Sequence, residues 1–163
     1  MRRKDREIRD IDAIFDILMR CDTIRIAFHG EKYPYIVPVS FGAEMEGGRP
    51  AVCFHCARQG MKLDLLRENP RVCVEGDIFI RTETTGHGIT TRYESVIGFG
   101  DCRLLTDEAE IMHGLKLLTE HYGYHDYSVE RCRGVENVFV GKIILEQITG
   151  KRNLPVPAAD SAG

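Results

Sequence analysis

Residues 54–66, FHCARQGMKLDLL, place a histidine, a cysteine, a glycine and a lysine close together at the end of an apolar run. Two kinds of chemistry fit these residue types. Cys53, His55 and Cys56 offer the sulfur and nitrogen atoms that a zinc site or a redox thiol site would use. Gly60 and Lys62 instead fit a seat for an anion, in which backbone N–H groups and one ammonium group meet the negative charge. The choice depends on which element carries each residue.

The metal and thiol interpretations are weakened by the alternation of side chains along a β-strand. In a strand, Cys53 and His55 point to one face and Cys56 to the other, so the Cys-x-x-Cys pair shares a metal only if the chain turns between them. No second Cys/His pair follows at finger-like spacing, and we expect no metal. A redox dithiol needs the pair at a helix N-terminus, whereas this pair ends a strand.

The anion interpretation depends on a helix that begins near Gly60. The order strand, loop, helix leaves exposed backbone N–H groups near Gly60 and Met61, and a helix N-terminus favours negative charge. Lys62 lies in the first turn, where a cation opposes the helix dipole unless a bound phosphate compensates for it. The alternative is that Gly60 only ends a loop and that Lys62 is solvated. His55 is likewise either a structural side chain or a proton donor.

Length and composition limit the class of protein. A chain of 163 residues fits one domain, expected at residues 1–152, with a loose Pro/Ala/Ser-rich tail at residues 153–163. A formal net charge of −3 gives no general reason to expect nucleic acid as a partner. No apolar run approaches the roughly 20 residues that span a bilayer, and no secretion signal precedes the first element, so we expect a cytoplasmic protein without a membrane partner. The six cysteines lie mostly in apolar runs, as buried free thiols do in a reducing compartment.

The apolar periodicity predicts the elements that position these side chains. Helices are expected at residues 5–20, 61–68 and 107–122, and strands at 23–28, 33–42, 50–56, 71–81, 92–105 and 138–148. The first three strands should form a meander, and the polar residues 82–91 a long loop that is either a lid or a solvated connection. Because no βαβ alternation is present, these elements predict an α+β (mainly β) protein, an antiparallel barrel or sandwich with packed helices.

Prolines and glycines refine this expectation. Pro34 and Pro38 cannot donate hydrogen bonds to a neighbouring strand, which predicts an edge or an open side at those positions. Gly98 and Gly100 mark candidate bulges or close backbone approaches within the long strand at residues 92–105.

Four segments, in their order and at their separations, carry a resemblance to a known family: PYIVPVSFG, FHCARQGMKLDLLRENPRVC, TRYESVIGFG and ITGK. The chain resembles the pyridoxamine 5′-phosphate oxidase-like FMN-binding split-barrel family, and within it the nitroimidazole-resistance branch. The resemblance runs from the first helix to Lys151. It implies a six-stranded antiparallel split β-barrel that forms a homodimer, with FMN bound at the subunit interface.

The resemblance also implies roles for individual residues. Pro38, Val39, Ser40 and Phe41 would lie along the isoalloxazine ring, and His55, Cys56 and Ala57 would border the flavin. Gly60, Met61 and Lys62 would hold the phosphate, Ser95 and Val96 would face the cofactor from the long strand, and the ITGK segment would lie near it. His55 is the expected catalytic residue, as a proton donor on the substrate side of the flavin.

The function implied is that of an FMN-dependent oxidoreductase acting on small molecules such as nitroimidazoles or quinones. The alternatives are a flavin-binding protein with little turnover and a haem-binding split barrel, in which His55 or His29 would be the axial ligand. The arginine-rich substrate-phosphate signature and the C-terminal signature of true pyridoxamine phosphate oxidases are missing, which argues against vitamin B6 oxidation. No dinucleotide fingerprint indicates the electron donor.

Overall fold

The computed structural model of the chain describes residues 3–86, 88–129 and 134–155. The elements, in chain order, are η1 (Lys4–Arg6), β1 (Glu7–Ile8), α1 (Ile11–Met19), β2 (Ile24–Phe28), β3 (Tyr35–Val39), β4 (Phe41–Glu46), β5 (Arg49–Ala57), α2 (Met61–Glu68), β6 (Arg71–Thr85), β7 (Gly88–Leu104), α3 (Glu108–His121), η3 (Val135–Asn137), β8 (Val138–Ile144) and β9 (Gln147–Asn153). In the described residues no helix is both long and apolar enough to cross a membrane.

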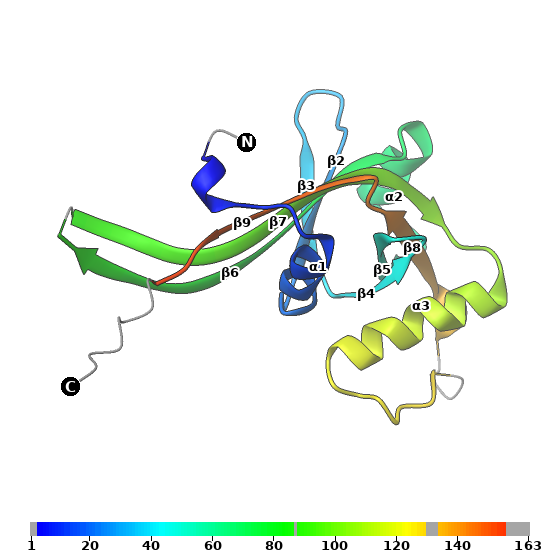
Figure 1. The fold of residues 1–163 in the computed structure, drawn as a ribbon. Coiled ribbons are helices and arrows are strands. Elements are labelled where there is room, and N and C mark those ends of the chain that lie inside the picture. Colours follow the sequence, from blue (N-terminus) through cyan, green and yellow to red (C-terminus); the bar gives the residue numbers. More distant parts are fainter. Residues whose placement is uncertain (1–2, 87, 130–133, 156–163) are drawn as a thin grey trace.

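The described strands form one antiparallel sheet that packs around an apolar core. Their order is β3-β2-β6-β7-β8-β5-β4, and β9 pairs with β7 and with β1. β7 joins the two halves because its first part pairs with β9 and its last residues pair with β8. Helix α1 packs on β6, β7 and β9, whereas α3 packs on β4, β5 and β8 (Figure 1). The expected α+β, mainly β, antiparallel barrel with packed helices is confirmed, with nine described strands in place of six.

The meander expected from the first three strands is wrong in one respect. Residues 33–42 do not form one strand, because the chain leaves the sheet at Ser40 between β3 and β4. β3 pairs only with β2, and β4 pairs with β5, so two separate hairpins replace the meander. The edge predicted from the prolines is confirmed for Pro38, which lies in β3 at one end of the strand order.

The long loop expected at residues 82–91 is also wrong, since residues 82–85 belong to β6 and residues 88–91 to β7. β6 and β7 stay paired from Arg71 to Thr85, and Figure 1 shows them projecting from the body on the side away from α3. Threonines suit a strand, and the hydroxyls of Thr82 and Thr91 lie 3.3 Å apart across the pair. Arg92 donates to Glu83 at 2.6 Å, which ties the two strands together. His87 lies outside the described residues.

The strand expected at residues 138–148 is divided into β8 and β9 by a sharp corner. At that corner Leu145 N donates to Pro50 O and Glu146 N donates to Phe99 O, both at 2.9 Å. The corner passes close to β7, and a Cβ atom on Gly100 would lie 2.1 Å from the Ile144 carbonyl oxygen. The close backbone approach predicted there is therefore confirmed.

The helices match the sequence prediction except at the N-terminus. α2 has the predicted bounds, and α3 begins after Asp107, whose carboxylate accepts a hydrogen bond from Glu110 N at 3.0 Å. The first helix is shorter than the predicted residues 5–20 because Ile8 pairs with Gly150 of β9 and Asp10 caps α1. The expected tail lies mostly in residues 156–163, outside the described residues.

Candidate functional site

A cavity of about 450 Å³ lies beneath α3, between that helix and the sheet. Ser40, which follows β3, and His55 on β5 line it from the sheet side. These two residues meet because Phe41 pairs with Phe54, which sets Ser40 opposite His55. The other lining residues come from α3 and the segment after it: Leu115, Leu118, Thr119, Tyr122, Tyr124, Tyr127, Val129, Gly134, Val135 and Val138.

The side chains of β5 alternate as the sequence predicts. Cys53 faces α3, since a Cβ atom on Gly114 of that helix would lie 3.5 Å from the Cys53 sulfur. His55 is exposed on the same face and lines the cavity, whereas Cys56 is buried in the core cluster on the other face. The two cysteines therefore do not form a dithiol pair.

The loop after β5 leads to a helix start of the kind that binds anions. Gly60 is the N-cap of α2 with φ 130° and ψ 162°, and no side chain caps the helix there. Its carbonyl accepts a hydrogen bond from Leu63 N at 2.9 Å, so the first turn is formed while the amides of Met61 and Lys62 stay at the open end. Burial raises the pKa of the Cys56 thiol, and the nearby Lys62 ammonium partly offsets this rise. Lys62 thus brings positive charge to the end of β5 beside the helix start.

The segment that carries Ser40 is held in place by the end of α3. The Tyr122 hydroxyl accepts a hydrogen bond from Phe41 N at 3.3 Å and donates to the Asp22 carbonyl at 2.8 Å. The rings of Phe41 and His121 pack with their centroids 4.3 Å apart. No local sequence signal indicates this role for Tyr122, because 81 residues separate it from Phe41.

The residues that the resemblance assigned to the cofactor differ in their exposure to solvent. The exposed ones are Pro38, Ser40, His55, Ala57, Gly60 and Met61, and the partly buried ones are Val39, Lys62 and Ser95. Phe41, Cys56 and Val96 are at most 4% exposed and belong to the core cluster, so their side chains do not present a surface to a ligand. Any contact these three make is through the backbone.

Ser95 and Val96 lie apart from the cavity within one chain. They pair with Lys151 and Gly150 of the ITGK segment, on the part of β7 that joins β9. Neither residue lines the cavity that holds His55. The structure therefore brings the β3 to α2 residues together and leaves the β7 and β9 residues on another part of the same subunit.

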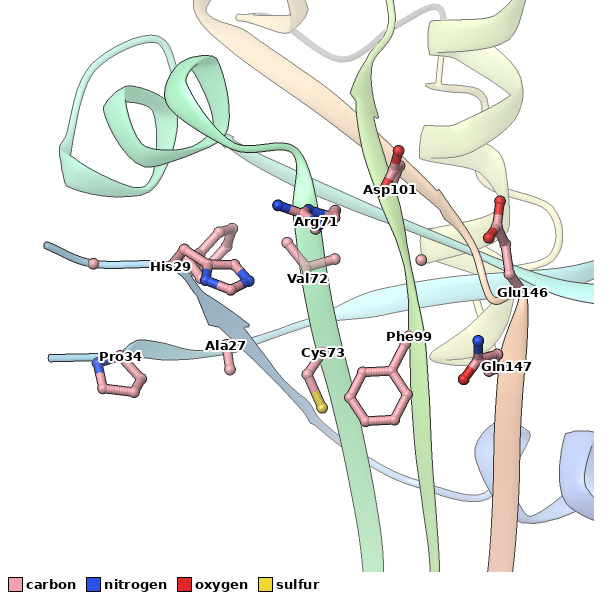
Figure 2. A pocket seen from close by; sticks show the side chains of 13 residues that line it. Ala27, His29, Pro34, Arg71, Val72, Cys73, Phe99, Asp101, Glu146 and Gln147 are labelled. Carbon is pink, nitrogen blue, oxygen red and sulfur yellow. The ribbon is translucent and has the colours of Figure 1, made fainter.

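A second cavity, of about 570 Å³, lies on the outer face of the sheet. Figure 2 shows Cys73, Phe99 and Gln147 in a row across β6, β7 and β9, with Ala27 and Pro34 to one side. His29 lines this cavity, but none of the residues assigned to FMN does. The outer face is the same one that presents Phe99 to solvent at 50% exposure.

Comparison with solved structures identifies the fold as the flavin-binding split barrel. A proposed 5-nitroimidazole antibiotic resistance protein from Bacteroides thetaiotaomicron is similar with a TM-score of 0.79 and 26% identity, over 90% of this chain and 86% of that one. The flavocytochrome Anf3 from Azotobacter vinelandii matches with a TM-score of 0.78 at 18% identity, over 99% and 75% of the two chains. An FAD and heme binding protein from Mycobacterium smegmatis matches with a TM-score of 0.76 at 16% identity, over 94% and 77%.

The family follows from the sequence itself. No curated protein matches the chain. The sequence model of the family described as pyridoxamine 5′-phosphate oxidase matches residues 10–152, which include the strand, loop and helix around His55 and Lys62. The chain belongs to the pyridoxamine 5′-phosphate oxidase family.

Proposed function

We propose that the protein binds FMN and acts as an oxidoreductase that reduces small molecules such as nitroimidazoles or quinones. The observation that carries this proposal is the uncapped start of α2 at Gly60, with Lys62 in its first turn, a few residues from the exposed His55. A phosphate dianion suits this arrangement because the helix amides donate to it and the lysine supplies a charge-assisted hydrogen bond. Family membership and the resemblance at 26% identity to a nitroimidazole-resistance protein support the same function.

The chemistry of the residues around the helix start supports the proposed binding of a flavin nucleotide. A Cβ atom on Gly60 would meet nothing within 4 Å, so the approach to the helix amides is open. From there, exposed Ala57 and His55 lead to Ser40, along the path that the ring of the cofactor would take. FMN would supply the transfer of a hydride or of electrons, and the chain would bind it, orient the substrate and provide a proton from His55.

A homodimer would complete this site. The outer face presents a row of paired residues across four strands, Ile36, Ala27, Cys73 and Phe99, of which Ile36 is 58% and Phe99 50% exposed. An apolar sheet face of this kind is most simply covered by a second copy about a two-fold axis. Such a pairing would also let Ser95 of β7 face a cofactor held by the other subunit.

The dimer is tested by Phe99→Asp, which places a carboxylate in the middle of that face. Sedimentation velocity should show a dimer for the wild-type protein and a monomer for the variant, because an unpaired charge buried in an interface is strongly unfavourable. Met45→Asp is the control, since Met45 is a 37% exposed residue on β4, away from the outer face. A variant that stays dimeric, or a wild-type monomer, would contradict the proposed interface.

FMN binding is tested by titration with Lys62→Ala. We expect the dissociation constant to rise about 10- to 100-fold, since a hydrogen bond to a charged group contributes about 1.5–3 kcal/mol. Lys116→Ala, which removes a lysine 59% exposed on α3, should bind FMN like the wild-type protein. Equal FMN affinity in all three proteins would refute the phosphate seat, and a Soret band in the purified protein would favour the haem alternative.

Turnover is tested by adding NADPH and either metronidazole or menadione to the FMN-loaded protein. Reduction of one quinone consumes one NADPH and one proton, transfers two electrons, and yields one hydroquinone and one NADP⁺. His55→Ala should lower the rate about 100-fold or more if His55 donates the proton, and FMN affinity reports separately on binding. FMN binding without NADPH oxidation would favour a low-turnover flavin-binding protein or another electron donor.

A further inference from the structure

A cluster of basic side chains around one tyrosine lies on the outer face of the sheet, away from the cavity beneath α3. Tyr93 of β7 is on the same face as Phe99, because an even number of residues separates them along a regularly paired strand. For the same reason Lys151 of β9 is on the face of Gln147, which Figure 2 shows. The Lys151 ammonium lies 5.5 Å from the centroid of the Tyr93 ring, within the roughly 6 Å of a cation–π contact. Arg6 of η1, which contacts β9, reaches the same tyrosine.

The three side chains offer hydrogen-bond donors in excess of acceptors. Lys151 and Arg6 donate to the hydroxyl oxygen of Tyr93, and neither cation can accept a hydrogen bond in return. The O–H proton of Tyr93 is therefore left for another acceptor, and no hydrogen bond among the described residues takes it up. Burial raises the pKa of Tyr93, but the hydrogen bonds and charges of Lys151 and Arg6 outweigh burial and hold it below its ordinary value. The surroundings of this phenol thus favour negative charge.

Three carboxylates on the neighbouring segments do not neutralise the cluster, because each is closer to another basic side chain. The pairs are Asp5 with Arg3 at 2.6 Å, Glu7 with Arg9 at 3.1 Å and Asp77 with Arg25 at 2.6 Å. Glu7 is the strand partner of Lys151, yet it forms its ion pair elsewhere. Arg6 is 3.9 Å from Asp5, and among the described residues Lys151 has no ion pair with a carboxylate. Positive charge therefore remains available to a ligand.

We propose that Tyr93, Lys151 and Arg6 form a binding site for an oxyanion, and that the chemical class of its ligand is a phosphate group. Two cations balance the double negative charge of a phosphate, and the phenol adds a third kind of donor to its oxygens. The site goes beyond the proposed function, because it is separate from the start of α2 and does not depend on FMN. Free phosphate and the phosphate of an organic ester share this chemistry.

The ionisation of Tyr93 reports whether the site is occupied, because a bound dianion disfavours the phenolate and raises the pKa of Tyr93. NMR of the protein with isotope-labelled tyrosine Cζ atoms follows each phenol between about pH 7 and 10, and Tyr93→Phe identifies the signal. Sodium sulfate is the probe, since its charge is constant over this range, and sodium chloride at equal ionic strength controls for screening. Sulfate should raise the pKa of Tyr93 further than chloride does, and the sulfate dependence gives the affinity.

Two substitutions test the cations of the site. Lys151→Met and Arg6→Met should each weaken sulfate binding at least about tenfold, because each removes a charge-assisted hydrogen bond. Lys32→Met is the matched control, since Lys32 also lies over a tyrosine ring, 5.2 Å from the centroid of Tyr33, but outside the cluster. It should bind sulfate like the wild-type protein. FMN affinity should stay within about twofold in all three variants.

The outcomes separate this site from the proposed function. A sulfate response no larger than that of chloride, or an equal sulfate affinity in Lys151→Met, would overturn the oxyanion site even if FMN binds. A parallel loss of sulfate and FMN affinity in Lys151→Met would also overturn it, because Lys151 would then belong to the flavin site. If the wild-type protein fails to bind FMN, the proposed function is wrong, and the sulfate titration still decides whether the oxyanion site exists.

Calorimetry at about pH 8, where phosphate is a dianion, distinguishes the two sources of the ligand. The probes are inorganic phosphate and phenyl phosphate. Similar affinity for both would support a site for free phosphate, whereas at least about tenfold tighter binding of phenyl phosphate would support a site for a phosphate ester. Binding of neither probe would contradict the proposal.

Discussion

Replacing Gly60 by alanine tests the phosphate seat through the backbone alone. With φ 130° and ψ 162°, Gly60 occupies a conformation that is essentially restricted to glycine, and holding another residue there costs about 1–3 kcal/mol. No atom lies within 4 Å of the position of the new Cβ, so steric overlap adds nothing. Alanine also reduces the conformational entropy of the unfolded chain, which stabilises the folded state by about 0.4–1 kcal/mol. The free energy of unfolding of Gly60→Ala should therefore fall by about 1–2 kcal/mol.

Urea unfolding at a fixed protein concentration measures this change. With a slope of about 2 kcal/mol per molar urea, the midpoint should fall by about 0.5–1 M. Gly86→Ala is the matched control, because Gly86 has equally open surroundings and no positive φ, and it should be neutral or slightly stabilised. FMN affinity of Gly60→Ala should also fall by about tenfold, since relief of the strain rotates the helix amides away from the phosphate.

The two readouts of Gly60→Ala refute different steps of the reasoning. An unchanged urea midpoint would mean that the backbone at residue 60 is not restricted to glycine in solution. A lower urea midpoint with unchanged FMN affinity would support the strained conformation of Gly60. It would also show that the start of α2 does not bind the phosphate.

Two further predictions concern the elements around the site. Tyr122→Phe removes the hydrogen bonds of the Tyr122 hydroxyl with Phe41 N and with the Asp22 carbonyl. It should lower the free energy of unfolding by about 1–2 kcal/mol, seen as a fall in Tm of about 2–6 °C, and an unchanged Tm would show that these two contacts contribute nothing. Burial raises the pKa of the free thiols of Cys21 and Cys53 to about 11 and that of Cys102 to about 12. These thiols ionise at lower pH in the unfolded chain than in the folded one, so their contribution to stability should be constant below about pH 9 and fall above it by about 1.4 kcal/mol per pH unit for each thiol. The fall should end near pH 11 for Cys21 and Cys53 and near pH 12 for Cys102. Iodoacetamide at pH 8 should likewise leave these three cysteines unmodified until urea is added, and rapid labelling of the native protein would contradict their burial.

Features whose causes lie within a few residues of one another were predictable from the sequence. α2 was predictable because an apolar pattern begins at Met61 and ends before Asn69-Pro70, and α3 because Asp107 is a good N-cap. The separation of Cys53 from Cys56 was also predictable, because strand alternation depends only on the chain itself. The helix start at Gly60, with Lys62 in its first turn, was predictable for the same reason, as a property of one strand, one loop and one helix.

The tertiary structure alone decided what depends on contacts between distant segments. Residues 82–91 carry too few apolar side chains to indicate a strand, yet residues 82–85 pair with residues 88–91 because each strand of the β6–β7 hairpin satisfies the backbone of the other. Only the folded chain shows that the Tyr122 hydroxyl contacts Phe41 N, and that residues of α3 and His55 line one cavity. Hydrophobic periodicity reports which face of an element is buried but not what buries it, so the residues that border a cavity are fixed by packing between elements far apart in the sequence.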